Sequence, residues 1–124
     1  MTVHDFLQWL NRYGNAWVAG DPGAAVQLFV ADASYYETPF DAPMIGTEAI
    51  HRYWTEGAKN AQTDVTFEAT PVSLIGNTGF ARWRATFRRV PSNTFVELDG
   101  VLSARFDDGM RCEEFREWWH RNET

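Results

Sequence analysis

The chain has 124 residues, 44% of them hydrophobic and 23% charged, which is typical of a folded globular protein with one domain. Its net charge of −6 and its pI of about 4.9 disfavour nucleic acids and anionic membranes as partners, because both carry negative charge. The single cysteine, Cys112, cannot form an internal disulfide, and the N-terminal residues lack the basic and apolar regions of a signal peptide. We therefore expect one domain over residues 1–124, located in the cytoplasm.

The first part of the sequence predicts two helices. Thr2 and Asp5 form a capping-box pattern, and apolar residues then recur at helical spacing until Gly20 ends the helix. The inner face of this helix would comprise Phe6, Leu10, Tyr13 and Trp17. Asp21 and Pro22 are typical of the cap and the first residue of a second helix.

A short edge strand and a third helix are predicted next. Residues 34–37 favour a strand and are followed by a proline-rich loop over residues 39–46. Thr47 is the expected N-cap of the third helix, whose inner face would comprise Ile50, Tyr53, Trp54 and Ala58.

The second half changes to the two-residue period of strands. Alternation of apolar and polar residues predicts strands at 65–70, 81–88, 95–106 and 111–120, with turns at 76–79, 91–93 and 107–109. Helices followed by an antiparallel meander predict an α+β fold, in which the N-terminal helices pack on a curved antiparallel sheet and enclose a pocket.

Several segments resemble the SnoaL-like and ketosteroid-isomerase-like proteins of the nuclear transport factor 2 (NTF2-like) superfamily. These segments are residues 13–21, 28–33, 39–40, 46–50, 99–101 and 116–119, so that the resemblance covers nearly the whole chain. It implies the cone-shaped NTF2-like (cystatin-like) fold. The superfamily contains isomerases, cyclases, dehydratases, epoxide hydrolases and non-catalytic binders, so the resemblance specifies the fold better than the activity.

Two candidate catalytic residues follow from the similarity to ketosteroid isomerases. The resemblance implies that the hydroxyl of Tyr13, eight residues before Asp21, donates a hydrogen bond to a developing enolate. It also implies that Glu37, five residues after Asp32, is the general base. The structural alternatives are a tyrosine that fills the core and an edge-strand carboxylate in solvent.

Glu117 and Asp99 are the candidates for a further acid. Glu117 shares strand parity with apolar neighbours and resembles a catalytic acid of epoxide hydrolases; once buried, it must be either neutral or paired with an arginine. Leu102 stands where the isomerases carry a protonated aspartate, and Asp99 lies on the opposite face unless a bulge intervenes. The epoxide hydrolase dyad is replaced by Trp83 and Ala85.

The expected ligand is a largely apolar, polycyclic or aromatic carbonyl compound that undergoes isomerisation, cyclisation or dehydration. The expected binding residues are Trp17, Phe40, Met44, Trp54, Trp83, Leu102 and Trp119, which are mostly aromatic. No cofactor or metal is expected, because no phosphate loop, dinucleotide motif or Cys/His cluster is present. The alternative function is a non-catalytic ligand-binding or dimerisation module.

The predicted sheet also indicates a homodimer, as the resemblance implies. Four arginines, at positions 82, 84, 88 and 89, form a basic stripe on the outer face of one strand. They could pair with Glu97 and Glu113 of a second copy across a twofold axis.

Overall fold

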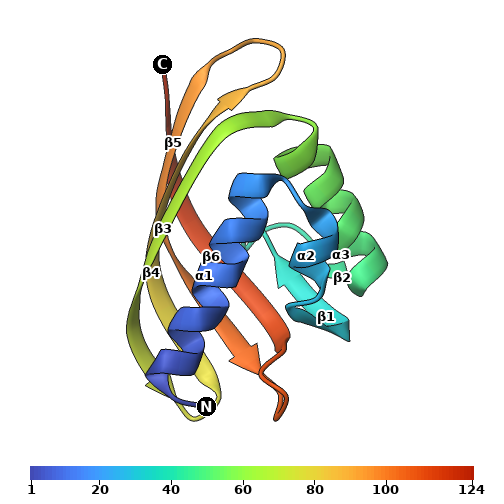
Figure 1. The fold of residues 1–124 in the computed structure, drawn as a ribbon, viewed down its shortest axis with the longest axis vertical. Helices are drawn as coiled ribbons and strands as arrows, with labels where there is room; N and C mark the ends of the chain where they lie inside the picture. The colour runs from blue at the N-terminus through green and yellow to red at the C-terminus, as the bar shows by residue number, and fades with distance from the viewer.

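The computed structural model describes residues 1–124 and places three helices against a single curved sheet (Figure 1). The helices are α1 (Val3–Ala19), α2 (Pro22–Val26) and α3 (Thr47–Trp54), and α3 continues into the π-helical turn η1 (Thr55–Lys59). The strands are β1 (Phe29–Tyr36), β2 (Met44–Ile45), β3 (Gln62–Ile75), β4 (Thr78–Arg89), β5 (Phe95–Phe106) and β6 (Cys112–Glu123).

Helix α1 begins and ends where the sequence predicts. The Thr2 side chain accepts a hydrogen bond from the Asp5 backbone, and the Asp5 carboxylate accepts one from the Thr2 backbone. Gly20 ends the helix in the left-handed conformation with a φ of 61°. Helix α1 lies across the concave face of the sheet (Figure 1). Its predicted inner face is buried, together with Trp9, and Tyr13 and Trp17 contact rings of the strands.

The sheet has six strands in the order β2-β1-β6-β5-β4-β3. All neighbouring strands are antiparallel except β1 and β6, which run parallel. The predicted α+β architecture is confirmed, and the sheet is mostly antiparallel. The parallel pair matters for function, because it places the end of β1 directly beside the middle of β6.

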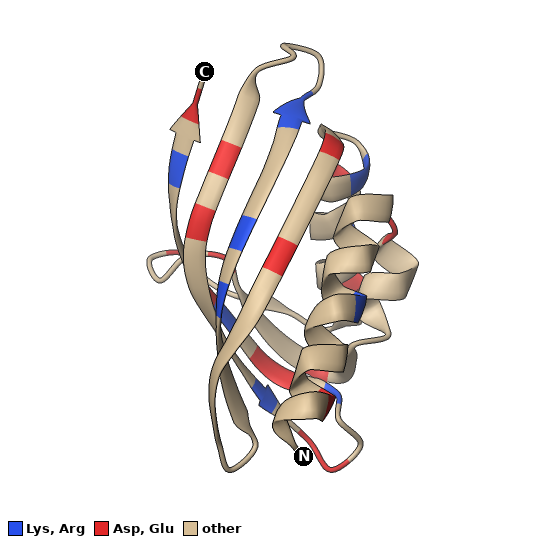
Figure 2. Cartoon of the chain, turned by 60° about the vertical axis from the view of Figure 1, so that its left-hand side comes forward, with Lys and Arg blue, Asp and Glu red and all other residues tan.

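The outer face of the sheet carries charges of alternating sign on neighbouring strands (Figure 2). Arg82 and Arg84 of β4 each lie 3.5 Å from Asp99 of β5, and Arg105 lies 3.6 Å from Glu113 of β6. Arg82 and Arg84 of the arginine stripe are therefore already paired within the chain, and Glu113 has an intramolecular partner. Exposed pairs of this kind add little stability, but they satisfy the charges on this face.

Three predicted boundaries in the first half differ from the structure. Strand β1 begins at Phe29 rather than near residue 34, because Phe29 pairs with Cys112 of β6 in a long-range contact that local propensity does not reveal. The proline-rich loop contains the short strand β2. The N-cap of α3 is Gly46, which makes no side-chain capping bond, so Thr47 is already inside the helix.

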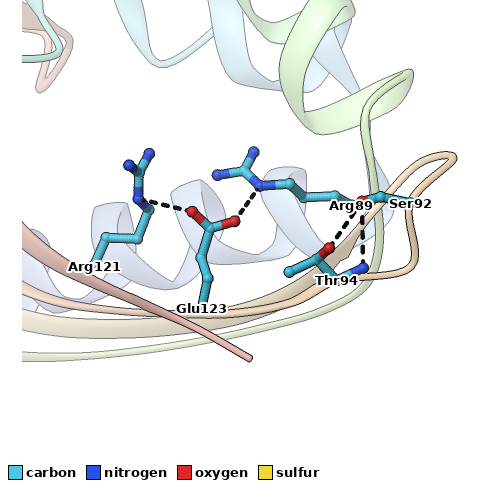
Figure 3. A network of polar contacts seen from close by, with 5 residues as sticks. All are labelled: Arg89, Ser92, Thr94, Arg121 and Glu123. Carbon is cyan, nitrogen blue, oxygen red and sulfur yellow. Dashed lines mark hydrogen bonds and ion pairs between the residues drawn. The ribbon is translucent and has the colours of Figure 1, made fainter.

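The far ends of β4 and β6 are joined by a polar network (Figure 3). The Glu123 carboxylate accepts a hydrogen bond of 2.6 Å from Nε of Arg89 and lies 3.1 Å from Nε of Arg121. Its pKa is lowered, first by the hydrogen bond from Arg89. Within the turn after β4, Thr94 donates to the hydroxyl of Ser92. These contacts hold β6 in register to its last residues.

The close approach of β5 and β6 depends on Gly100 of β5. Gly100 lies between Trp83 of β4 and Trp119 of β6, and a Cβ atom here would overlap the backbone carbonyl oxygen of Trp118. Because the obstacle is backbone, a larger residue could be accommodated only by moving β6.

We predict that Gly100→Ala destabilises the protein by about 1–3 kcal/mol, the usual cost of inserting a methyl group where there is no space. Chemical denaturation measures the difference. Gly23→Ala in α2 is the matched control and should be neutral or slightly stabilising, because its nearest neighbour is at 3.4 Å and the site is helical. Equal stability of the two variants would contradict the proposed steric role of Gly100.

Candidate functional site

A cavity of about 50 Å³ lies between α1, α3, β1 and β6. Its lining comprises Tyr13, Trp17, Tyr35, Tyr53, Trp54, Gly57, Ala58, Gln62 and Glu117. One ordered water needs about 10–15 Å³ measured in this way, so the cavity has room for about four waters or for one small functional group. It is too small for a polycyclic ring system, which corrects the expectation that a whole steroid-like molecule lies inside.

Glu117 is the one buried charged residue of the chain, at 7% exposure. It points inward from β6, between Phe115 and Trp119 on the same face, as its strand parity predicts. All the ion pairs of the chain involve other carboxylates. Burial raises the pKa of Glu117 well above its usual value, and the nearby Glu37 carboxylate raises it further. Of the two alternatives, the neutral carboxylic acid is therefore favoured over an arginine pair.

The hydroxyl groups of Tyr13 and Tyr35 meet at 2.9 Å inside the cavity. Tyr13 comes from the inner face of α1, and Tyr35 comes from β1 opposite Phe115. Burial raises the pKa of both tyrosines well above the ordinary value, so both stay protonated. Since one hydroxyl donates to the other, the pair keeps one proton that is free to donate to a ligand.

Tyr53 and Trp17 complete the polar lining. Burial, and then the carboxylates of Glu117 and Glu37, raise the pKa of Tyr53, which also remains a donor. The indole N–H of Trp17 donates to the side-chain oxygen of Gln62 at 2.6 Å, which joins the end of α1 to the start of β3. The cavity thus combines aromatic walls with hydroxyl groups and one neutral carboxyl.

Glu37 lies outside this cavity. It follows the last residue of β1, is half-buried, and its backbone carbonyl accepts a hydrogen bond of 3.2 Å from the indole of Trp119. Its side chain belongs to a neighbouring cleft of about 580 Å³, which Phe40 and Trp119 also line. Glu117 contributes to the linings of both the cavity and the cleft.

The predicted binding residues separate into three groups. Trp17 and Trp54 line the cavity, while Phe40 and Trp119 line the cleft. Trp83, Leu102 and Met44 line neither: the first two are fully buried in the core, and Met44 lies in the edge strand β2, partly buried against the core.

The comparisons with known proteins agree with this architecture. The sequence matches the family model described as the SnoaL-like domain over residues 10–114. The chain belongs to the SnoaL-like domain family. No curated protein matches the sequence.

One solved structure shows which fold the SnoaL-like chain adopts. It is that of SalBIII, an epoxide hydrolase/cyclase-like enzyme with a role in pyran ring formation in the polyether salinomycin. The two chains are 18% identical, and the match covers 91% of this chain and 88% of that chain with a TM-score of 0.79. The predicted NTF2-like fold is thereby confirmed.

Asp99 does not line the cavity, but it lines the neighbouring cleft together with Arg82. It lies on the outer face of β5, where it is shared by Arg82 and Arg84, and no bulge in β5 turns it inward. Asp99 is therefore separate from the cavity that holds Tyr13 and Glu117, and on the cleft side its carboxylate is paired with arginines.

Sequence reasoning did not assign Tyr35, Tyr53 or Gln62 to the site. Tyr53 could have been found, because it lies on the predicted inner face of α3. Tyr35 is brought inward by the pairing of β1 with β6, and Gln62 by the π-helical turn that precedes β3. Neither arrangement has a local sequence signal.

The structure shows no group of three or more His, Cys, Asp or Glu side chains arranged to hold a metal ion. None of its helices combines the length and the apolar character that a membrane span requires.

The raised pKa of Glu117 predicts a specific dependence of stability on pH. The folded protein binds this proton more tightly than the unfolded chain does, so the stabilisation is complete below the unfolded pKa and is lost as pH rises towards the folded pKa. Glu117→Gln cannot ionise. Between the unfolded and the folded pKa of Glu117, the free energy of unfolding of Glu117→Gln minus that of the wild type should therefore rise by about 1.4 kcal/mol per pH unit.

Denaturant titrations at several pH values measure this difference. Glu113→Gln is the control, because Glu113 is a surface carboxylate beside Arg105 and should show no such gain. Parallel pH profiles for the wild type and Glu117→Gln would mean that Glu117 is ionised in the folded protein.

Proposed function

We propose that this SnoaL-like protein is an enzyme in which Glu117 donates a proton to an oxygen atom of a largely apolar small molecule. The observation that carries the proposal is a buried carboxyl without a cationic partner, in the same cavity as the hydroxyls of Tyr13 and Tyr35. A neutral acid held among hydroxyl donors is suited to general-acid catalysis.

The volumes support a divided binding site. The cavity accommodates the reacting oxygen, and the cleft, at about 580 Å³, has the size of a typical ligand pocket. Phe40 and Trp119 offer aromatic surface in the cleft for the apolar body of the substrate. Glu117 lies at the boundary, where it could reach an oxygen held between the two.

Glu37 is the partner base in this proposal. Its carboxylate accepts a proton from a substrate carbon or hydroxyl on the cleft side, the electron pair moves through the substrate, and the Glu117 carboxyl protonates the oxygen at the other end. Isomerisation and dehydration next to a carbonyl both follow this scheme. Ring closure does so as well: the deprotonated hydroxyl oxygen attacks an epoxide carbon, and Glu117 protonates the oxygen released when that C–O bond breaks. SalBIII, which has the same fold, is described with a role in pyran ring formation.

The proposal predicts that Glu117→Gln and Glu37→Gln each lower kcat by about 10²-fold or more, since each removes one proton transfer. Tyr13→Phe should lower it through loss of the hydroxyl pair. Turnover of a panel of steroid ketones, phenolic polyketide-like compounds and hydroxy-epoxides, followed by mass spectrometry, provides the assay.

Glu113→Gln is the matched control and should keep full activity, because Glu113 is a surface carboxylate beside Arg105 and lines neither the cavity nor the cleft. Unchanged turnover in Glu117→Gln would contradict the assignment of the acid. Tight binding of compounds from the panel without any turnover would instead identify a non-catalytic binding module.

We also propose that two copies associate through the outer face of the sheet. Val101 and Trp118 are paired across β5 and β6 on this face and are 49% and 42% exposed, although both are large and apolar. Both also line the cleft, so a second copy covering them would close one side of it. Because Arg82, Arg84 and Arg89 are already paired within the chain, this apolar contact would contribute more than ion pairs between the copies.

Sedimentation should show a dimer at micromolar concentration, and Trp118→Glu should shift it to monomer because the twofold axis would bring like charges together. Ile75→Glu is the control. Ile75 is exposed at the end of the edge strand β3, away from β5 and β6, so this substitution should leave the dimer intact. A wild-type protein that sediments as a monomer at this concentration would contradict the proposed dimer.

A further inference from the structure

Five aromatic side chains surround the small cavity. They belong to Tyr13, Trp17, Tyr35, Tyr53 and Trp54. The ring of Tyr13 stands at 82° to that of Trp17 and at 90° to that of Trp54, with ring centroids 6.4 and 5.3 Å apart. Both pairs are edge-to-face contacts, and the three rings line the cavity from different directions, as the rings of an aromatic cage do.

Glu117 is the only carboxylic acid among the cavity residues, and no Lys, Arg or His lines the cavity. The groups that face Glu117 are Tyr13 from α1, Tyr35 from β1 and Tyr53 from α3, with Glu37 at the end of β1. None of them can supply the positive charge that a buried carboxylate requires, and Arg82 and His120 of the adjoining cleft form no ion pair with Glu117. An ionised Glu117 would therefore lack a cationic partner within the protein, and a cationic ligand in the cavity could be that partner.

We propose that this cavity binds the head group of a small alkylammonium ion, of which trimethylammonium is the type. Aromatic faces attract such a cation and, unlike water, do not need it to donate hydrogen bonds. The room for about four waters also matches a head group of a few heavy atoms. Anionic groups would be repelled by Glu37 and by ionised Glu117.

Binding of the cation would be coupled to a proton. In the free protein Glu117 is neutral, and an ammonium ion beside it favours the carboxylate, so the ligand enters as the carboxyl proton leaves for solvent. The inference depends on the proposed function in one respect, namely that the cavity is the ligand site. In turnover the same walls would stabilise positive charge that develops on a substrate carbon as its oxygen is protonated.

Choline and its neutral isostere 3,3-dimethylbutan-1-ol, which have the same shape, provide a direct test. Calorimetry in buffers of different ionisation enthalpy measures both affinity and proton release, and the fluorescence of Trp17 and Trp54 reports occupancy of the cavity. We expect choline to bind at least about tenfold more tightly than the isostere, since a desolvated cation–aromatic contact alone has this magnitude. Choline should release a proton on binding, and its affinity should rise with pH until Glu117 ionises in the free protein.

Three variants separate the contributions to binding. Glu117→Gln should lose proton release and at least about tenfold in choline affinity, whereas Glu113→Gln, with the same change in net charge, should lose neither. Tyr53→Phe keeps the aromatic face and should bind choline, while Tyr53→Leu should bind it more weakly. Thermal denaturation verifies that each variant is folded.

Equal affinity for choline and the isostere, or unchanged choline binding in Glu117→Gln, would overturn the inference. Turnover that depends on Glu117, combined with no choline binding at millimolar concentration, would leave the proposed acid catalysis standing and remove the cation site. Choline binding without turnover of any panel compound would support the cation site and argue against the enzyme.

Discussion

Burial of the Glu117 carboxyl without a cation beside it is the constraint on which the rest of the site depends. A carboxylate in such a position loses its hydration and gains no ion pair, so the proton is retained. The neutral acid can donate a proton to a ligand, and the carboxylate that remains can then bind a positively charged group. The fold keeps this group buried even though an apolar side chain would cost less stability.

Three features of the architecture create this environment. Helix α1 lays its aromatic face over the concave side of the sheet and brings Tyr13 next to β6. The parallel pairing of β1 with β6 places Tyr35 inside and leaves Glu37 at the edge, where its carboxylate influences Glu117 from the cleft side. The absence of a side chain at Gly100 allows β6 to approach β5 closely, which sets the position of Glu117 relative to the helices.

The elements with strong local signals could be predicted from the sequence. The capping box, the glycine that ends α1 and the strict alternation in β4 and β5 all have a direct physical cause within a few residues. The inward orientation of Glu117 followed from the same alternation, and so did the outward orientation of Asp99. These side chains could be assigned to a face because a strand has only two faces.

The details that depend on long-range packing could not be predicted. The start of β1 is set by its pairing with β6, and the position of Gln62 is set by a π-helical turn without a sequence signature. Whether Trp83 or Trp54 lines a cavity depends on how the surrounding rings fill space, since both side chains are almost completely buried. The size of a cavity in particular depends on how the core packs. In this protein Tyr13 lines the small cavity, whereas Glu37 lines only the neighbouring cleft.

The ionisation state of Glu117 is the central claim, and a carbon-13 NMR titration of the glutamate side-chain carboxyls measures it directly. The Glu117 resonance is identified by its absence in Glu117→Gln. Our account predicts that this carboxyl stays protonated well above the pH at which the exposed glutamates ionise, and that it titrates last among them. A Glu117 carboxyl that ionises together with the surface glutamates, or below them, would contradict the account.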